Sequence, residues 1–200
     1  MLDLFSGTGS VGKYFKKLGF NVISVDNEQK FEPDICCDVL KWDYKDMYPK
    51  GFFTVIAAGV PCTEYSMALT TRPRDMESAD KLVEKTLEII DYFEPPIWWI
   101  ENPRNGRLKT RKMMKELDFL DVDYCQFSDW GYQKPTRIWG SPQIASLPDK
   151  FCDLQTCDNM MDTIYGGRKH FEQLGGNKMK FSTIEKYRIP TTLSGRVLVE

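Results

Sequence analysis

Short apolar runs recur along the chain, and most of them end at a glycine, a proline or an acidic residue. Runs of this kind are typical of β-strands that are buried in a sheet. The run over residues 52–58 is the clearest example, because Gly59 and Pro61 close it. The strands that this pattern predicts are residues 1–5, 21–26, 34–38, 52–59, 97–101, 119–127 and 137–140.

Between these strands, apolar positions follow a helical spacing. In the first such segment Val11, Tyr14 and Phe15 fall on one face, and Gly19 is placed to end the helix. The pattern predicts four helices in all. They cover residues 11–18, the segment marked by Val83, Leu87 and Ile90, residues 108–117, and residues 182–200 with Pro190 near the start.

The regular alternation of strand and helix predicts an α/β fold, a doubly wound Rossmann-like sheet with helices on both faces. In such a sheet, ligands bind at the carboxyl ends of the strands. After residue 141 the apolar periodicity fades, and glycine pairs and the only histidine appear. We therefore expect a main domain over residues 1–141, a short loop-rich appendage over 142–181, and a helix over 182–200 that returns to the main domain.

Composition narrows the class of protein without identifying it. A chain of 200 residues with 42% apolar and 28% charged residues is ordinary for one globular domain. The net charge of −2 gives no global basic field, although arginines and lysines cluster locally over residues 104–112. No apolar stretch approaches the length of a membrane span. The chain opens directly into a strand and carries six cysteines, so we expect a cytoplasmic protein with free thiols.

A glycine-rich turn follows the first expected strand. Its sequence, FSGTGS over residues 5–10, would let backbone amides approach a ligand at the start of the next helix. A tight strand–helix turn without a ligand would give the same pattern. Asp26 ends the second expected strand, where it is placed to bind ribose hydroxyls, and Asp38 ends the third, where it is placed to bind an adenine amino group. Together these features favour a ligand that contains adenosine.

A thiol and an acid end two further strands. Cys62 follows Pro61, which stiffens the turn, and Glu101-Asn102 ends the strand that comes next along the chain. A nucleophilic cysteine reacts as the thiolate and needs a nearby positive charge. The sequence offers three candidates for that charge, Arg72, Arg74 and Arg137. A lone cysteine is more often a small buried apolar residue, but its position at a strand end opposite an acid favours catalysis.

These motifs together resemble the cytosine C5 methyltransferase family. Residues 3–7 (DLFSG) match its cofactor motif, and Pro61-Cys62 with Ser66 downstream matches its nucleophile motif. Residues 101–102 match its acid motif, and residues 130–137 resemble its later Gln-x-Arg-x-Arg motif. The order and spacing agree from residue 1 to about residue 140, and the chain looks most like short members associated with phages and viruses.

The resemblance implies a methyl transfer from S-adenosyl-L-methionine to carbon 5 of cytosine in DNA, with S-adenosyl-L-homocysteine as product. Cys62 would be the nucleophile and Glu101 the acid, Asn102 would hold the acid in place, and Arg137 would stabilise negative charge near the base. In a duplex the target cytosine must first leave the base stack. The cofactor-binding residues implied are Phe5, Ser6, Gly7, Thr8, Gly9, Ser10, Asp26, Asp38 and Pro61.

The chain departs from the family pattern in ways that leave alternatives open. Thr63 follows the cysteine where glutamine is usual, Pro103 replaces a valine, and Pro135 stands where an arginine is expected. Residues 142–181 are too few for an ordinary target-recognition domain. The sequence is therefore also compatible with an RNA cytosine methyltransferase, with a catalytically weak relative that only binds cofactor or nucleic acid, or with an enzyme whose specificity comes from a partner subunit.

Other chemistry-bearing residues have mainly structural interpretations. We expect no metal in the catalytic site. Cys152, Cys157 and His170, with Cys125 as a fourth candidate, form a loose zinc-binding pattern that would staple the tail. The tryptophan pair at residues 98–99 is more typical of a protein core than of a platform on which bases stack. Trp130 and Tyr132 are better placed for nucleic-acid contact.

Overall fold

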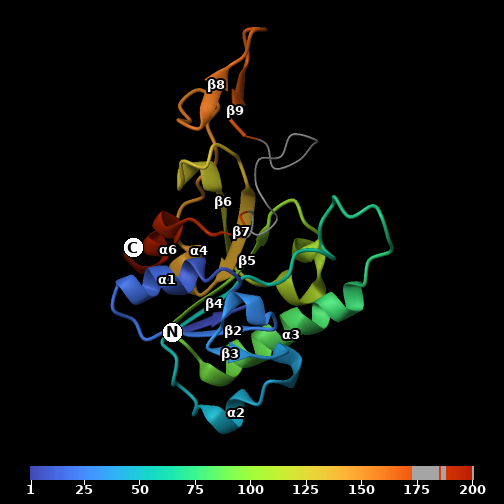
Figure 1. The fold of residues 1–200 in the computed structure, drawn as a ribbon, viewed down its shortest axis with the longest axis vertical. Coiled ribbons are helices and arrows are strands. Elements are labelled where there is room, and N and C mark those ends of the chain that lie inside the picture. Colours follow the sequence, from blue (N-terminus) through green and yellow to red (C-terminus); the bar gives the residue numbers. More distant parts are fainter. Residues whose placement is uncertain (173–184, 186–187, 200) are drawn as a thin grey trace.

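The computed structural model describes residues 1–172, 185 and 188–199. Its main strands are β1 (Leu2–Leu4), β2 (Ile23–Asp26), β3 (Ile35–Cys36), β4 (Val55–Ala58), β5 (Ile97–Pro103), β6 (Phe119–Asp123) and β7 (Pro135–Gly140). Among the described residues they form one sheet in the order β3-β2-β1-β4-β5-β7-β6 (Figure 1). Strands β1 to β5 are parallel, and β7 runs antiparallel to both β5 and β6.

Helices cover both faces of the sheet. The α-helices are α1 (Ser10–Lys17), α2 (Tyr44–Met47), α3 (Met76–Phe93), α4 (Pro142–Ala145) and α6 (Thr191–Val199). The 3₁₀ turns are η1 (Gln29–Phe31), η2 (Val39–Lys41), η3 (Leu108–Thr110), η4 (Lys112–Met114) and η5 (Tyr124–Gln126). Helix α3 lies on one face, and α1, α4 and α6 lie together on the other (Figure 1).

The alternation of side chains along each strand divides the core into two layers. On β4, Ile56 and Ala58 pack in the cluster that contains the apolar residues of α3. The neighbouring residues Val55 and Ala57 pack in the cluster that contains residues of α1, α4 and α6. Both faces of β4 are therefore buried, which explains its continuous apolar sequence.

The predicted α/β sheet with helices on both faces is confirmed, but two local predictions need correction. The strand expected over residues 119–127 ends at Asp123, where η5 follows, and no local pattern indicated that β7 reverses direction. The helix expected over residues 108–117 is wrong, because this segment forms only the short turns η3 and η4. Between them Arg111 is extended (φ −73°, ψ 143°), and its guanidinium pairs with Asp80 of α3. That tertiary ion pair overrides the helical spacing.

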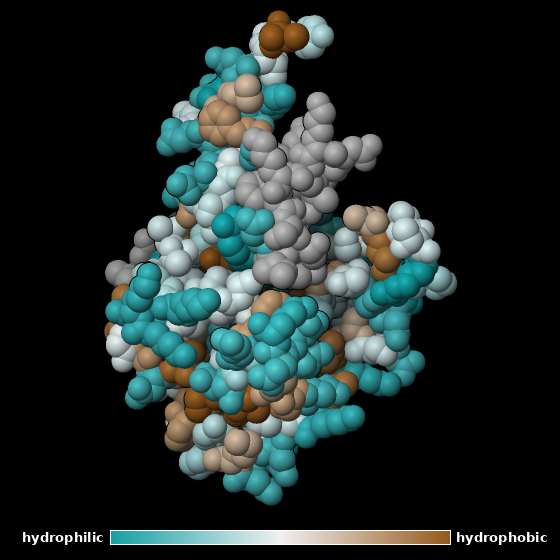
Figure 2. All heavy atoms as spheres, viewed as in Figure 1, coloured by the Kyte–Doolittle hydropathy of each residue, from teal (hydrophilic) through white to brown (hydrophobic). Residues whose placement is uncertain are grey.

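A small hairpin projects from the end of the molecule. Strands β8 (Met160–Asp162) and β9 (Arg168–His170) pair antiparallel, and Figure 1 shows them extending away from the main sheet. At the tip, Ile164 and Tyr165 are each 91% exposed, and Figure 2 shows hydrophobic atoms there. In the part of the chain that the structure describes, no helix is both long and apolar enough to span a membrane.

The expected division of the tail stays a prediction, because much of it lies outside the described residues, which omit 173–184, 186–187 and 200. Of the closing segment, the structure shows α6 following Pro190. Leu193 of α6 is buried beside Val11 and Phe15 of α1, and the Ile189 N–H donates to the Ser10 hydroxyl at 3.2 Å. The described end of the chain therefore contacts the first helix.

Candidate active site

One cleft lies at the carboxyl ends of the parallel strands β1, β2, β4 and β5. Its empty volume, which includes space open to solvent, is about 1090 Å³. This is where an open α/β sheet is expected to bind ligands. The predicted site residues that line it are Phe5, Ser6, Gly7, Thr8, Ser10, Asp26, Pro61, Cys62 and Glu101.

The glycine-rich turn needs its glycines for conformational reasons. Gly7 and Gly9 have φ values of +47° and +68°, a region that side chains with a Cβ rarely adopt. Phe5 also has a positive φ, +56°, which places backbone strain at the mouth of the cleft. Gly9 shapes the turn without lining the cleft. It precedes α1 without any side-chain cap, so the start of that helix is suited to an anionic or polar ligand.

Asp3 fixes the first helix against the first strand. Its carboxylate is 3% exposed and accepts the Gly12 N–H at 3.0 Å. Gly12 favours this contact, because a Cβ at this position would lie 3.0 Å from that carboxylate oxygen and would push it away. Burial raises the pKa of Asp3 to about 7. The floor of the cleft thus carries a carboxyl group that is partly protonated near neutral pH.

The two acids predicted to bind an adenosine group occupy different positions. Asp26 lines the cleft. Its two oxygens accept the N–H groups of Gly7 and Glu28 at 2.8 and 2.9 Å, which ties the glycine turn to the end of β2. Asp38 is not among the lining residues. Its carboxylate instead caps η2 by accepting the Leu40 N–H at 3.0 Å, so its expected contact with adenine stays a prediction.

The loop that carries Cys62 is fixed at both ends. Before it, the buried Asn102 donates its side-chain N–H to the Val60 carbonyl at 3.0 Å, which ties the loop to β5. After it, the Tyr65 N–H donates to the Cys62 carbonyl at 3.1 Å. The ring of Tyr65 is fully buried, and its hydroxyl donates to Asp80 of α3 at 2.9 Å. Cys62 is therefore held at the cleft by a constrained backbone.

Glu101 is the buried acid of the cleft. Its side chain is 10% exposed and accepts a hydrogen bond from the Tyr124 hydroxyl at 2.9 Å. Lys134 approaches the same carboxylate oxygen at 3.5 Å and also lies over the Tyr124 ring, 4.7 Å from its centroid. These two neighbours orient the carboxylate and balance its charge.

The pKa of the Cys62 thiol is raised above its ordinary value. Burial is the main cause, and the negative charge of Glu101 adds to it, whereas the positive charge of Lys134 lowers the pKa. The cation acting on the thiol is therefore Lys134. Of the arginines that the sequence suggested, Arg72 pairs with Glu64, and Arg74 donates to the Ser66 carbonyl at 2.8 Å.

Arg137 does not reach the cleft. It is opposite Asn102 in the β5–β7 register, so both residues point to the face of the sheet away from Glu101. Its guanidinium donates twice to Asp121, at 2.8 Å each, and stacks on the Phe119 ring. In this structure Arg137 joins β7 to β6, and its expected role near the base stays a prediction.

The remaining aromatic residues have mostly structural positions. Trp99 is 3% exposed and packs on Phe15 of α1, as expected for a core residue. Tyr132 is fully buried, so it offers no surface to a nucleic acid. Trp130 is half-buried against the rings of Tyr124 and Tyr132.

Tyr124 and Lys134 are the site residues that the sequence did not indicate. Tyr124 comes directly after β6, and Lys134 directly precedes β7. Both strands were expected, but their antiparallel register with β5 was not, and that register brings the two side chains to Glu101. Lys134 does fall inside the 130–137 motif, which was the only signal available.

A sheet of this strand order, 3-2-1-4-5-7-6 with helices on both faces, is typical of the Rossmann-like fold of methyltransferases. Residues 1–143 match the family model of C-5 cytosine-specific DNA methylases. The chain is also 35% identical, over 212 residues, to a "Probable DNA (cytosine-5)-methyltransferase" of Frog virus 3 (isolate Goorha). That match covers 96% of this chain and 95% of the viral protein.

Two solved structures are similar to this chain. One is a "putative DNA modification methyltransferase" encoded within a prophage (E. coli), with a TM-score of 0.51, 18% identity, and coverage of 70% of this chain and 45% of that chain. The other is the Dnmt2 methyltransferase of S. pombe (TM-score 0.49, 13% identity, 78% of this chain and 55% of that chain). The chain thus spans about half the length of these two proteins. It belongs to the C-5 cytosine-specific DNA methylase family, a family of enzymes.

Proposed function

We propose that this protein transfers a methyl group from S-adenosylmethionine to carbon 5 of cytosine in DNA, through a covalent adduct with Cys62. The observation that carries the proposal is the meeting of Cys62 and Glu101 in the cleft that the glycine turn and Asp26 also line. A thiol and a buried acid that line the same cleft suit a reaction that needs both a nucleophile and a proton donor. Family membership supports both the cofactor and the DNA substrate.

In the proposed reaction, the Cys62 thiolate adds to carbon 6 of cytosine. Glu101 hydrogen-bonds ring N3 and supplies the proton that the ring takes up, so electron density builds at carbon 5. S-adenosylmethionine supplies an electrophilic methyl group to that carbon. Water then takes the carbon 5 proton, the Cys62 thiolate leaves from carbon 6, and N3 returns its proton to Glu101, which restores the aromatic ring.

The neighbours of Glu101 favour this division of roles. The Tyr124 hydroxyl holds one carboxylate oxygen at 2.9 Å, which fixes the direction in which the acid faces the cleft. Lys134 acts on both groups. Its positive charge attracts the Glu101 carboxylate and lowers the pKa of the Cys62 thiol. We propose that Lys134 supplies the positive charge that the nucleophile needs.

Covalent trapping tests the proposed function. A cytosine that carries fluorine at carbon 5 cannot lose that substituent as a proton, so the Cys62 adduct should persist and retard the protein on a denaturing gel. We expect an adduct with 5-fluorocytosine DNA in the presence of S-adenosylmethionine, and none with the Cys62→Ala variant. An adduct with RNA alone would identify an RNA enzyme, and no adduct with either would contradict the mechanism.

Asp26 provides a separate test of the cofactor site. We expect Asp26→Ala to weaken binding of S-adenosylmethionine about 10- to 100-fold in calorimetry, the equivalent of one lost hydrogen bond to a charged group. The loss of its bond to Gly7 would also loosen the turn. Asp46→Ala is the matched control, since Asp46 is exposed on α2. Unchanged affinity in Asp26→Ala would rule out this carboxylate as a cofactor ligand.

A further inference from the structure

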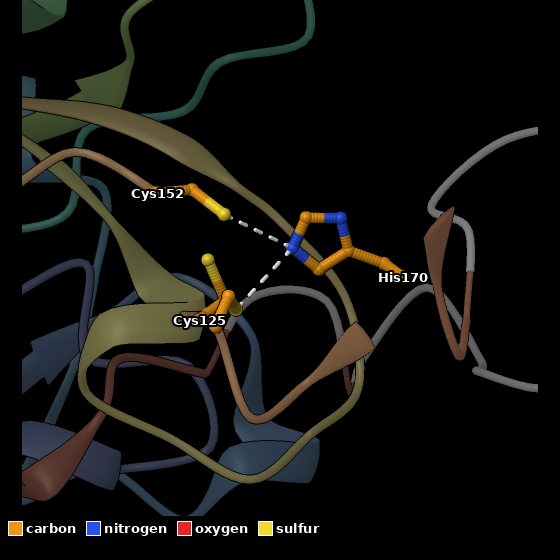
Figure 3. A group of neighbouring side chains, drawn as sticks. Cys125, Cys152 and His170 are labelled. Carbon is orange, nitrogen blue, oxygen red and sulfur yellow. Dashed lines mark hydrogen bonds between the residues drawn. The ribbon is translucent and has the colours of Figure 1, made fainter. Parts of the chain in front are cut away.

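Three cysteines and the only histidine meet at the base of the projecting hairpin. Cys125 lies in η5, next to Tyr124, and Cys152 and Cys157 lie in the loop before β8. His170 ends β9. Figure 3 shows the side chains of Cys125, Cys152 and His170 pointing toward one another. The ligand atoms of all four residues lie within 4.8 Å of one another.

These distances match a tetrahedral zinc site. With Zn–S bonds of about 2.3 Å and Zn–N bonds of about 2.0 Å, neighbouring ligand atoms are about 3.5 to 3.8 Å apart. The Cys152 and Cys157 sulfurs lie 3.4 and 3.8 Å from the same nitrogen, Nε2 of His170. One ring nitrogen directed at two thiols is the geometry expected of a shared metal ion.

The surroundings also suit a closed, structural site. Cys125 and Cys157 are buried, Cys152 and His170 are half-buried, and no cysteine forms a disulfide. Among the residues that the structure describes, the buried apolar cluster here contains only Cys125, Cys157 and Met160, with Cys152 packed against it. So small a core cannot by itself hold a loop and hairpin in place, which is the situation in which small protein segments use a metal.

Hydrogen bonds fix the backbone that carries the candidate metal ligands. The Asp123 carboxylate accepts the Cys152 N–H at 2.8 Å, and Asn159 donates to the Cys125 carbonyl at 2.8 Å. Alternation along β9 directs His170 and its ladder partner Met160 to the cysteines, and Lys169 with Met161 away from them. The backbone therefore presents all four ligands to one point.

We propose that Cys125, Cys152, Cys157 and His170 bind one Zn²⁺ ion. Four protein ligands fill the tetrahedron and leave no open position, so the ion is structural. It joins the base of the β8–β9 hairpin to η5, where Tyr124 carries the hydrogen bond to Glu101. The site stands on its own ligands and does not depend on the proposed methyl transfer.

Metal analysis of the purified full-length protein tests the proposal. Elemental mass spectrometry should find one tightly bound zinc per chain after dialysis against a weak chelator. His170→Ala and Cys157→Ser should each lower the zinc content at least about tenfold at the same free zinc concentration, as expected for loss of a direct ligand. Cys36→Ser is the matched control and should keep its zinc, because Cys36 is exposed on β3.

Two further measurements keep the result interpretable if a variant folds poorly. His170→Cys should restore zinc binding through four thiolates. Co²⁺ bound to the wild type should show the intense visible bands of a tetrahedral thiolate site, and these bands should change in His170→Cys. A wild-type protein without zinc, or His170→Ala and Cys157→Ser variants that retain it as Cys36→Ser does, would overturn the proposal.

Discussion

Replacing Cys62 by alanine should abolish methyl transfer to cytosine-containing DNA, with a loss of at least about 1000-fold in rate. Carbon 5 of cytosine is a poor nucleophile until an atom adds at carbon 6, and the thiol of Cys62 is the group at the cleft that can add there. Alanine removes that atom, and the described residues that line the cleft include no other thiol. The measurement is the transfer of a radiolabelled methyl group at saturating cofactor.

Folding should be preserved in this variant, which makes the loss of activity informative. Cys62 is only half-buried, and its loop is held by Asn102 and Tyr65 rather than by its own side chain. The thermal melting curve should therefore match that of the wild type. Cys36→Ala, at an exposed position on β3, should keep full activity. Full activity in Cys62→Ala would exclude the covalent mechanism.

Replacing Glu101 by glutamine should lower the rate of methyl transfer about 100- to 10,000-fold. A glutamine amide keeps the shape and hydrogen bonds of the side chain but cannot deliver a proton to ring N3. Glu77→Gln is the matched control, since Glu77 is mostly exposed at the start of α3. Activity that survives in Glu101→Gln would mean that another group supplies the proton.

The same variant should make the thiol of Cys62 more reactive in the absence of DNA. The negative charge of Glu101 raises the pKa of Cys62, so its removal lowers that pKa and increases the thiolate fraction at a fixed pH below it. Lys134→Gln should act in the opposite direction, because the charge of Lys134 lowers the pKa of Cys62. Alkylation should therefore be faster in Glu101→Gln and slower in Lys134→Gln.

The pH profile of alkylation measures these shifts directly, with the signal of Cys62→Ala subtracted as background. In the wild type the midpoint should lie above 9.0, the ordinary value for a thiol, since burial favours the neutral form. The midpoint should fall in Glu101→Gln and rise in Lys134→Gln. Shifts of both variants in the same direction would contradict the proposed electrostatic coupling.

A raised thiol pKa fits an enzyme whose nucleophile is restrained until its substrate arrives. In the free protein, burial and the Glu101 carboxylate both keep Cys62 in the thiol form. Ring N3 of cytosine accepts a hydrogen bond, so Glu101 can engage it only when the acid carries a proton. A bound cytosine would therefore leave no negative charge at Glu101 to raise the pKa of the thiol. The cleft would then favour the thiolate when the ring is in place.

The sequence by itself determined the outline of the fold and the cleft to which the two proposed reactive groups belong. Parallel strands end at a common edge of a sheet, so a glycine turn after β1, Asp26 at the end of β2, Cys62 after β4 and Glu101 in β5 were bound to converge. The strand and helix periodicities that predict this arrangement are local, because they depend on which face of each element is buried. The family motifs add the identity of the chemistry.

Only the tertiary structure decided which side chains meet across distant strands, because those contacts depend on the register between the strands. The antiparallel pairing of β7 with β5 and β6 directs Arg137 to Asp121, away from the cleft, and brings Lys134 and Tyr124 to Glu101. A shift by one residue would exchange these faces, and no local pattern fixes it. Likewise, Cys125 meets the cysteines of the tail because the loop before β8 and the end of β9 lie beside η5, a contact that only packing determines.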